Sequence, residues 1–191
     1  IANLASECRM PLCYGGGVHR LDQVQRIIST GIEKVSLGAT AVVNPNLVTE
    51  AAAQVGCQSI VVVMDVKKTG LMRRYEVLTH NGTKCTGFSP EQFALQAQEL
   101  GAGEILVNSI DRDGEMKGYD HELIAKVRSV VSTPITALGG ASSLDEMREL
   151  TQRHGVMGVA AGSLFVFKGK YRAVLINYPS PEQKKSIATL S

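Results

Sequence analysis

Two segments far apart in the chain carry the same pattern, and this internal repeat constrains the fold more than any other feature of the sequence. Residues 11–22 read PLCYGGGVHRLD and residues 134–145 read PITALGGASSLD, so that Pro, two Gly, Leu and Asp match in register. With one inserted residue the match continues through further pairs: Gly31 and Gly155, Val35 and Val159, Gly38 and Gly162. A repeat of this length covers two strands and two helical segments, which predicts two related half-barrels.

Short apolar runs alternate along the chain with longer amphipathic segments. The predicted strands are 11–14, 34–37, 60–64, 104–110, 134–138 and 156–161, and the predicted helices are about 21–29, 45–54, 90–100, 120–130 and 144–153. Such alternation is typical of parallel strands joined by helical crossovers. We therefore predict the α/β class and, because of the repeat, a (βα)8 barrel of the TIM type.

The predicted strands are fewer than the eight that close such a barrel. The segments 60–64 and 104–110 have no repeat partners, and by symmetry those partners could lie only before residue 1. We expect the first two βα units, roughly 60 residues in a barrel of typical size, to be missing, so that the predicted strands are strands 3–8. If the protein began at Ile1, two open sheet edges should make it poorly soluble.

A hairpin interrupts the alternation after the 60–64 strand. Residues 74–79 and 83–85 flank Asn81-Gly82, a dipeptide that favours a tight turn between antiparallel strands. We predict an insertion at about 72–86, either a surface excursion or a mobile loop over the active face. The domain prediction is one barrel domain over 1–179, followed by a solvated C-terminal tail over 180–191.

The composition is ordinary for a globular protein, with 44% hydrophobic and 20% charged residues and a formal net charge of +2. Because no basic tract stands out, nucleic acid is not an expected partner, and no apolar run is long enough to span a membrane. The four cysteines form no CxxC pair. We therefore expect reduced thiols in a cytoplasmic protein, no metal site and no other cofactor.

Glycine-rich turns follow four of the predicted strands, at the end where barrel enzymes have their active sites. Gly16-Gly17 and Gly139-Gly140 follow the first strand of each repeat, and glycine there lets backbone N–H groups approach an anion closely. Gly38-Ala39 and Gly162-Ser163 follow the second strand, where a helix N-terminus adds free N–H groups. One such turn could be simple turn geometry, but two in the same register predict a substrate with a phosphate at each end.

Carboxylates stand at the ends of the two central predicted strands. Asp65 follows the 60–64 strand, and Asp111 and Asp113 lie with Ser109 in the sequence SIDRDG that ends the next strand. Such side chains face the mouth of a barrel, where a carboxylate with a tuned pKa can act as general acid or base. We predict catalysis by Asp65 and Asp113. The alternatives are turn chemistry for Asp113 and an ion pair between Asp111 and Arg112.

Two charged residues stand at the opposite ends of the strands. Lys34 and Glu104 begin their strands and therefore point to the N-terminal face of the barrel, where such residues usually contribute stability. The histidines form no local cluster in the sequence, and we expect each at the surface or at a helix cap: His19, His80, His121 and His154.

These motifs resemble the cyclase subunit of imidazole glycerol phosphate synthase, a barrel of the ribulose-phosphate-binding type. The similar segments are CYGGGVH at 13–19, GIEKVS at 31–36, GAGEIL at 101–106 and SIDRDGEMKGYD at 109–120, and the similarity extends to about Phe167. The resemblance implies an enzyme that takes ammonia from a glutaminase subunit. It implies further that a bisphosphorylated ribulosyl-formimino substrate is converted into imidazole glycerol phosphate and an aminoimidazole carboxamide ribotide.

The resemblance also implies roles for single residues. Asp113 matches the family's catalytic Asp on the sixth strand, and Asp65 matches the acidic residue on the fifth, with Asp111 and Ser109 in support. Lys34 and Glu104 match members of the charged ring where ammonia enters the barrel. This replaces their purely structural interpretation and implies that the glutaminase docks on the N-terminal face as a heterodimer.

Two departures from the family pattern leave alternatives open. Gly38-Ala39 stand where the family has Asn-Thr, so only backbone N–H groups remain for one phosphate. Residues 165–179 resemble the tail of cyclase paralogues found with surface-polysaccharide genes. The chain could therefore be an ammonia-channelling subunit for nucleotide-sugar amidation in O-antigen synthesis. Further alternatives are the sister isomerase of histidine biosynthesis and a non-enzymatic remnant that cannot close its barrel.

Overall fold

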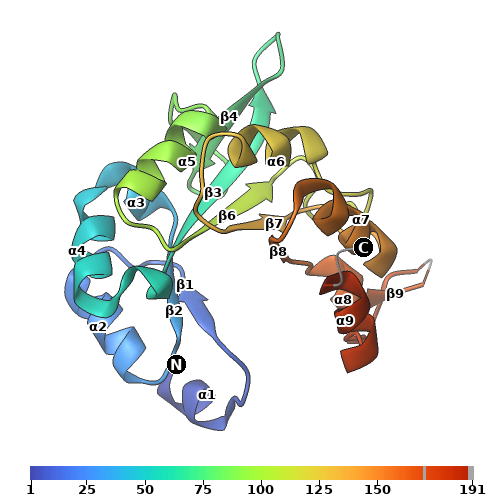
Figure 1. Ribbon diagram of the computed structural model, residues 1–191, viewed down its shortest axis with the longest axis horizontal. Helices are drawn as coiled ribbons and strands as arrows, with labels where there is room; N and C mark the ends of the chain where they lie inside the picture. The colour runs from blue at the N-terminus through green and yellow to red at the C-terminus, as the bar shows by residue number, and fades with distance from the viewer. Residues whose placement is uncertain (170, 189–191) are drawn as a thin grey trace.

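The computed structural model describes residues 1–169 and 171–188 and contains a curved sheet flanked by helices (Figure 1). The strands run in the order β1-β2-β3-β6-β7-β8, and every neighbouring pair on this path is parallel. Their bounds are Cys13–Gly15 for β1, Lys34–Leu37 for β2, Ile60–Thr69 for β3, Glu104–Ser109 for β6, Ile135–Leu138 for β7 and Gly158–Val159 for β8. Each falls on a predicted strand, and the α/β barrel class is confirmed.

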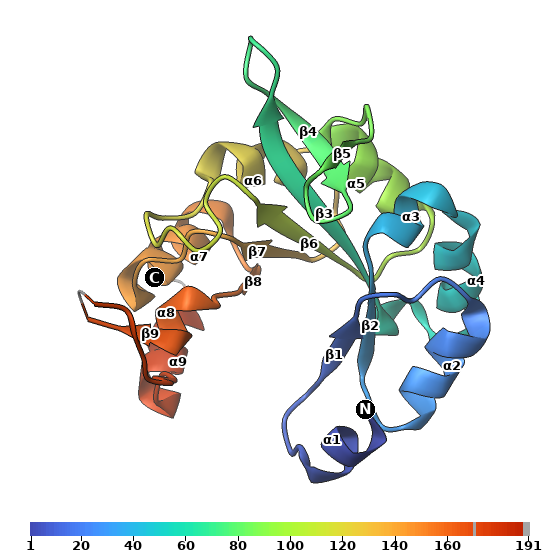
Figure 2. The ribbon, with the colours of Figure 1, turned by 180° about the vertical axis from the view of Figure 1, so that it is seen from behind.

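Helices follow the strands in the predicted alternation and lie on the outer side of the curved sheet (Figure 2). Their bounds are α1 Ala2–Glu7, α2 Leu21–Ser29, α3 Ala39–Val43, α4 Asn46–Val55, the 3-10 turn η1 Cys57–Ser59, α5 Pro90–Glu99, α6 His121–Arg128, α7 Leu144–His154, α8 Ser163–Val166 and α9 Pro181–Ala188. The order β1-α2-β2-α3 recurs as β7-α7-β8-α8. The repeat in the sequence is therefore a repeat in the structure.

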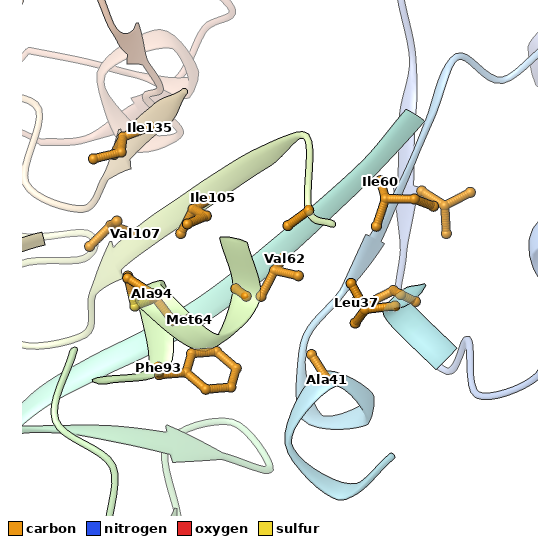
Figure 3. Packing of buried hydrophobic residues seen from close by; sticks show 14 of the residues in the cluster. Leu37, Ala41, Ile60, Val62, Met64, Phe93, Ala94, Ile105, Val107 and Ile135 are labelled. Carbon is orange, nitrogen blue, oxygen red and sulfur yellow. The ribbon is translucent and has the colours of Figure 1, made fainter. Parts of the chain in front are cut away.

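Alternation of side chains along each strand separates an apolar outer face from a more polar inner face. In β2, Val35 and Leu37 are buried, whereas Lys34 and Ser36 are only partly buried. Outward side chains of β2, β3, β6 and β7 form one cluster with residues of α3 and α5 (Figure 3): Leu37, Ala41, Ile60, Val62, Met64, Phe93, Ala94, Ile105, Val107 and Ile135. Burying a large apolar side chain contributes about 1.5–3 kcal/mol, so this layer is the main source of stability.

The helix caps follow the sequence signals closely. In α5, Ser89 accepts a hydrogen bond from the backbone N–H of Gln92 at 3.2 Å, and the Gln92 side chain accepts from the backbone N–H of Ser89 at 3.0 Å. Pro90 is the first residue of the helix, and Gly101, just beyond its end, has a φ of 94°. The predicted start and end of this helix are therefore confirmed.

The parallel path has β1 at one end and β8 at the other. In Figure 1 the elements form an arc, with α1 and β1 at one end and β8, α8 and α9 at the other. Within the described residues, β1 pairs only with β2 and β8 only with β7. The expectation that two further βα units precede β1 stays a prediction.

β3 is longer than predicted, and Asp65 lies inside it instead of at its end. The strand pairs with β2 over Ile60–Val62 and, beyond that, with the antiparallel strand β4 over Asp65–Thr69. The expectation that Asp65 ends a strand was wrong because β4, Arg74–Thr79, continues the ladder where β2 has ended.

The predicted hairpin is present as the second half of a three-stranded meander. β4 pairs with β5, Lys84–Cys85, across a turn in which His80, Asn81 and Gly82 have φ values of 54°, 56° and 74°. The meander joins the main sheet through β3, and the β3–β4 turn projects away from that sheet (Figure 1).

The chain after α8 contains two short strands that the sequence did not predict, and the helix α9 lies where a solvated tail over 180–191 was expected. Phe167–Lys168 and Ala173–Val174 pair as the short strands β9 and β10, and α9 follows. Arg148 in α7 donates to the backbone oxygen of Ser186 at 3.0 Å, and the Ile187 side chain is buried in a cluster with residues of α7. Ile187 supplies the apolar contact that holds this helix, whereas residues 189–191 lie outside the described part.

Candidate functional site

The first glycine pair of the repeat lines an open cavity of about 370 Å³ at the carboxyl ends of β1 and β2, beside the middle of β3. Gly16 and Gly17 follow β1 with φ values of 101° and 72°, and Gly38 is the N-cap of the short helix α3. The wall is completed by residues of β2, α3, β3 and the β4–β5 turn, which include Ser36, Ala39, Asp65, His80 and Asn81.

The second glycine pair lines a much smaller pocket, of about 10 Å³, at the carboxyl ends of β7 and β8. Gly139 and Gly140 have φ values of 95° and 98°, and Gly162 is the N-cap of α8. The same pocket is lined by Asp113, Gly114, Met116, Ala160 and Ser163. The structure thus brings each predicted pair of glycine turns together, one pair of turns in each pocket, and each pocket also contains one of the two predicted catalytic carboxylates.

The two halves agree in backbone geometry but differ in packing. Gly38 and Gly162 have nearly the same φ, −101° and −103°. A Cβ on Gly16 would meet nothing within 4 Å, whereas a Cβ on Gly140 would lie 2.2 Å from the carbonyl oxygen of Gly118. The first pair therefore needs glycine for its backbone conformation alone, and the second also needs it for close contact with the loop that follows β6.

Asp65 projects from the inner face of β3, and its partner was not predicted from the sequence. Asn108 of β6, directly beside it in the ladder, donates a hydrogen bond from Nδ2 to Asp65 Oδ1 at 2.8 Å. Asn108 lies four residues after Glu104 on β6 and therefore on the same inner face. That spacing is the one sequence signal that could have singled it out.

Asp113 lies in a tight turn that starts at the end of β6. The backbone N–H groups of Arg112 and Asp113 donate to the carbonyl oxygen of Ser109 at 3.1 and 3.0 Å, and the Asp113 side chain is exposed. Asp111 accepts a hydrogen bond from the backbone N–H of Lys68 at 3.0 Å. Arg112 instead lies near Asp120, with 3.7 Å between Nε and Oδ2, so the alternative of an Asp111–Arg112 ion pair was wrong.

The histidines are partly placed as predicted. His19 lies beside the first glycine pair, with Nδ1 2.7 Å from the carbonyl oxygen of Gly17, and His80 lies in the β4–β5 turn. His121 and His154 stack with ring centroids 5.4 Å apart, which no local sequence pattern indicated because the two residues belong to different helices. Burial, followed by the nearby His121, lowers the pKa of His154.

Lys34 and Glu104 form an ion pair at the amino ends of β2 and β6. Thr136 of β7 donates a hydrogen bond to the other Glu104 oxygen at 2.6 Å. Burial raises the pKa of the Glu104 carboxyl, but the hydrogen bonds from Lys34 and Thr136 outweigh it and hold the pKa below its usual value. An open cavity of about 490 Å³ beside this pair is lined by Gln58, Ser59, Gly103 and Pro134.

Similarity to known proteins agrees with this arrangement. The family described as "Histidine biosynthesis protein" matches residues 1–172. This chain belongs to that family.

Relatives within the histidine biosynthesis family are similar over nearly the whole chain. A Leptospira interrogans protein named "Putative imidazole glycerol phosphate synthase subunit HisF" is 55% identical over 187 residues, which cover 98% of this chain and 74% of that protein. A Vibrio vulnificus protein whose name ends in "subunit hisF3" is 51% identical over 190 residues, which cover 100% of this chain and 73% of that protein. The Hyphomonas neptunium "Imidazole glycerol phosphate synthase subunit HisF" is 39% identical over 167 residues, which cover 87% of this chain and 66% of that protein. The resemblance found from the sequence is confirmed.

Within the described residues, 1–169 and 171–188, no helix is both long enough and apolar enough to cross a membrane. The same part of the chain holds no group of three or more His, Cys, Asp and Glu side chains placed to bind a metal ion.

The packing difference between the glycine pairs predicts unequal tolerance of alanine. Both positions have a φ near 100°, so Gly16→Ala should cost about 1–3 kcal/mol of unfolding free energy from backbone strain. Gly140→Ala should cost on the order of 1–3 kcal/mol more, because its methyl group would overlap the Gly118 carbonyl. Urea denaturation of the two variants measures the difference, and equal losses would contradict the packing described here.

The Glu104 ion pair predicts a pH-dependent contribution to stability. The pKa of the Glu104 carboxyl is lower in the folded protein than in the unfolded chain. The ion pair therefore contributes its full stability at pH values above the unfolded-state pKa, and this contribution is lost as the pH falls through the folded-state pKa. The stability lost in Glu104→Gln, on the order of 1 kcal/mol at neutral pH, should therefore shrink in acid. Denaturation measured from neutral to acid pH tests this prediction. The control is Glu50→Gln, which replaces an exposed glutamate of α4. A loss that is the same at neutral and acid pH would contradict the prediction.

Proposed function

We propose that this chain is the cyclase subunit of an imidazole glycerol phosphate synthase. The observation that carries the proposal is the pair of repeat-related pockets, each with two left-handed glycines, a glycine-capped helical turn and one carboxylate. Two anion-binding turns in one sheet suit a metabolite with a phosphate at each end. The names of the relatives support the same reaction.

In this proposal the backbone N–H groups at each pocket bind one phosphate of the bisphosphorylated ribulosyl-formimino substrate. The first phosphate is bound at Gly16, Gly17, Gly38 and Ala39, and the second at Gly139, Gly140, Gly162 and Ser163. Left-handed glycines expose consecutive N–H groups on one side of the chain, which makes them suitable for oxyanions. Ser163 adds a hydroxyl group in the second pocket, where Ala39 offers none in the first.

Asp113 and Asp65 are the proposed acid and base for cyclisation and cleavage. Their roles follow from position, since each lines the pocket that would hold one end of the substrate. Asn108 fixes the Asp65 carboxylate through its amide, which contacts Oδ1 and not Oδ2, the oxygen proposed to carry a proton. Asp113 stands on an exposed turn, where it can reach the substrate without being buried in its absence.

Ammonia is proposed to enter at the opposite end of the strands, beside Lys34 and Glu104. The ion pair lies at the amino ends of β2 and β6, and Ser36 and Thr136 are polar residues further along the same inner face. Polar groups at these positions suit a small polar molecule moving toward the carboxyl ends of the strands. The glutaminase subunit would dock on the face that bears Lys34 and Glu104, forming a heterodimer.

The test is turnover of the bisphosphorylated substrate with ammonium salt, which replaces the glutaminase. Asp113→Asn should lower kcat at least about a hundredfold, as expected for loss of a general acid or base. Asp145→Asn, an exposed aspartate of α7, is the matched control and should keep wild-type turnover. Wild-type protein that is folded but produces no imidazole glycerol phosphate would refute the proposal.

A specific observation favours a second candidate, the ammonia-channelling subunit for nucleotide-sugar amidation in surface-polysaccharide synthesis. Gly38-Ala39 provide no side-chain donor in the first pocket, which weakens it for a phosphate while leaving Lys34 and Glu104 in place. For that role we expect no cyclisation, and instead transfer of ammonia from the glutaminase to a sugar amidotransferase.

Restoring side-chain donors to the first pocket distinguishes the two candidates. A Cβ on Gly38 would meet only the Val63 carbonyl oxygen, at 3.9 Å, and Gly38 has a negative φ, so the pocket has room for Gly38→Asn with Ala39→Thr. If the chain is a cyclase, the double variant should lower KM for the bisphosphate about tenfold, as expected for one or two added hydrogen bonds to a charged group. Absence of turnover in both the folded wild type and the folded double variant would favour the channelling role.

A further inference from the structure

The turn that bears Asp113 is held against the second glycine pair by a side chain with no part in the reaction proposed above. Arg112 donates from Nη1 to the carbonyl oxygen of Gly118 at 2.9 Å, and the backbone N–H of Gly118 donates to the carbonyl oxygen of Gly140 at 2.8 Å. A Cβ on Gly140 would lie 3.1 Å from the Cβ of Arg112. The arginine therefore packs directly on the proposed phosphate-binding turn.

The same turn is also tied to the meander on its other side. The backbone N–H of Lys68 donates to Asp111 at 3.0 Å, and the backbone N–H of Ile110 donates to the carbonyl oxygen of Val66 at 2.9 Å. Both partners lie in the distal half of β3, where the strand pairs with β4. The meander thus supports the Asp113 turn from the side opposite the second glycine pair.

Asp120 connects the two sides. The residue is 7% exposed and is the N-cap of α6, where it accepts from the backbone N–H of Leu123 at 3.2 Å. Its Oδ2 faces Arg112, and its Oδ1 accepts a hydrogen bond from the hydroxyl of Tyr75 in β4 at 2.8 Å. A buried carboxylate is costly to leave without partners, so Arg112 and Tyr75 are held in position by the same group.

Tyr75 contributes its single hydroxyl proton to this contact. Its oxygen also lies 3.2 Å from Glu122, but the contact with Asp120 is shorter. Burial first, and then the hydrogen bond to Asp120, raise the pKa of the phenol well above its usual value, so the hydroxyl remains a donor. Lys68 lies over the Tyr75 ring, 4.5 Å from its centre, and pairs with Glu122 at 3.2 Å, which holds the ring from one face.

We infer that Tyr75 and Arg112 are positioning residues, which act through Asp120 to hold the Asp113 carboxylate at a fixed distance from the second glycine pair. The inference rests on the proposed function, because it assigns these residues a part in the same reaction. The inserted meander then has two roles: it forms one wall of the first pocket, and it supports the turn that bears Asp113. Neither residue touches the proposed substrate; each acts through backbone and carboxylate contacts.

The test compares Tyr75→Phe, which removes only the hydroxyl group, with Tyr171→Phe, a tyrosine that is 90% exposed. We expect Tyr75→Phe to lower kcat about tenfold with little change in KM, since a small displacement of a catalytic group costs rate more than binding. Arg112→Lys keeps the charge but loses the planar guanidinium group. Because Arg112 also contacts the second glycine pair, this variant should lower kcat and raise KM together. Tyr171→Phe should match the wild type.

Amide hydrogen exchange gives a readout that is independent of activity. In Tyr75→Phe, residues 110–118 should exchange faster while β2 and β7 keep wild-type rates, and Tyr171→Phe should leave both unchanged. If the wild type does not turn over, the proposed function fails, and exchange alone still decides whether Tyr75 holds the turn. Unchanged exchange at 110–118, a wild-type kcat in Tyr75→Phe, or faster exchange across the whole sheet would each overturn the inference.

Discussion

The structure depends on the burial of one face of a parallel sheet beneath its helices. Each strand presents alternate side chains to opposite faces, and the outward set packs against the helices in a single layer of aliphatic residues. Because this layer stabilises the fold, the inward side chains and the turns after the strands are free to be polar or to be glycine. The ion pair of Lys34 and Glu104, the Asp65–Asn108 contact and the glycine pockets all occupy positions that packing does not require to be apolar.

Local signals in the sequence predicted most of this arrangement. Regular alternation of apolar runs and amphipathic segments predicted the strands, because parallel strands buried under helices must be apolar along one face. Ser89, Pro90 and Gly101 predicted a helix start and end since each satisfies a backbone requirement at its own position. The repeat predicted which glycine turns belong together, and the structure brings those turns into common pockets.

What the sequence did not predict depends on contacts between distant segments. The length of β3 is set by β4, which returns along the edge that β2 leaves, and nothing within residues 60–69 indicates that partner. Asn108 matters because it stands beside Asp65 in the ladder, and Tyr75 because it reaches Asp120. The helix α9 forms where charged residues suggested a solvated tail, because Ile187 packs against apolar residues of α7. In each case the deciding partner lies far away along the chain.

The change of neighbour along β3 has a geometric consequence for the first pocket. Pairing of Asp65 with Leu78 fixes how far the turn at His80 and Asn81 extends above the glycines of the β1–α2 loop. A slip of two residues would preserve which side chains face inward yet would displace that turn by about 7 Å, twice the rise per residue of an antiparallel strand. The height of the pocket wall is therefore set by strand register, and a change in the length of the β3–β4 loop would alter the largest substrate that the cavity admits.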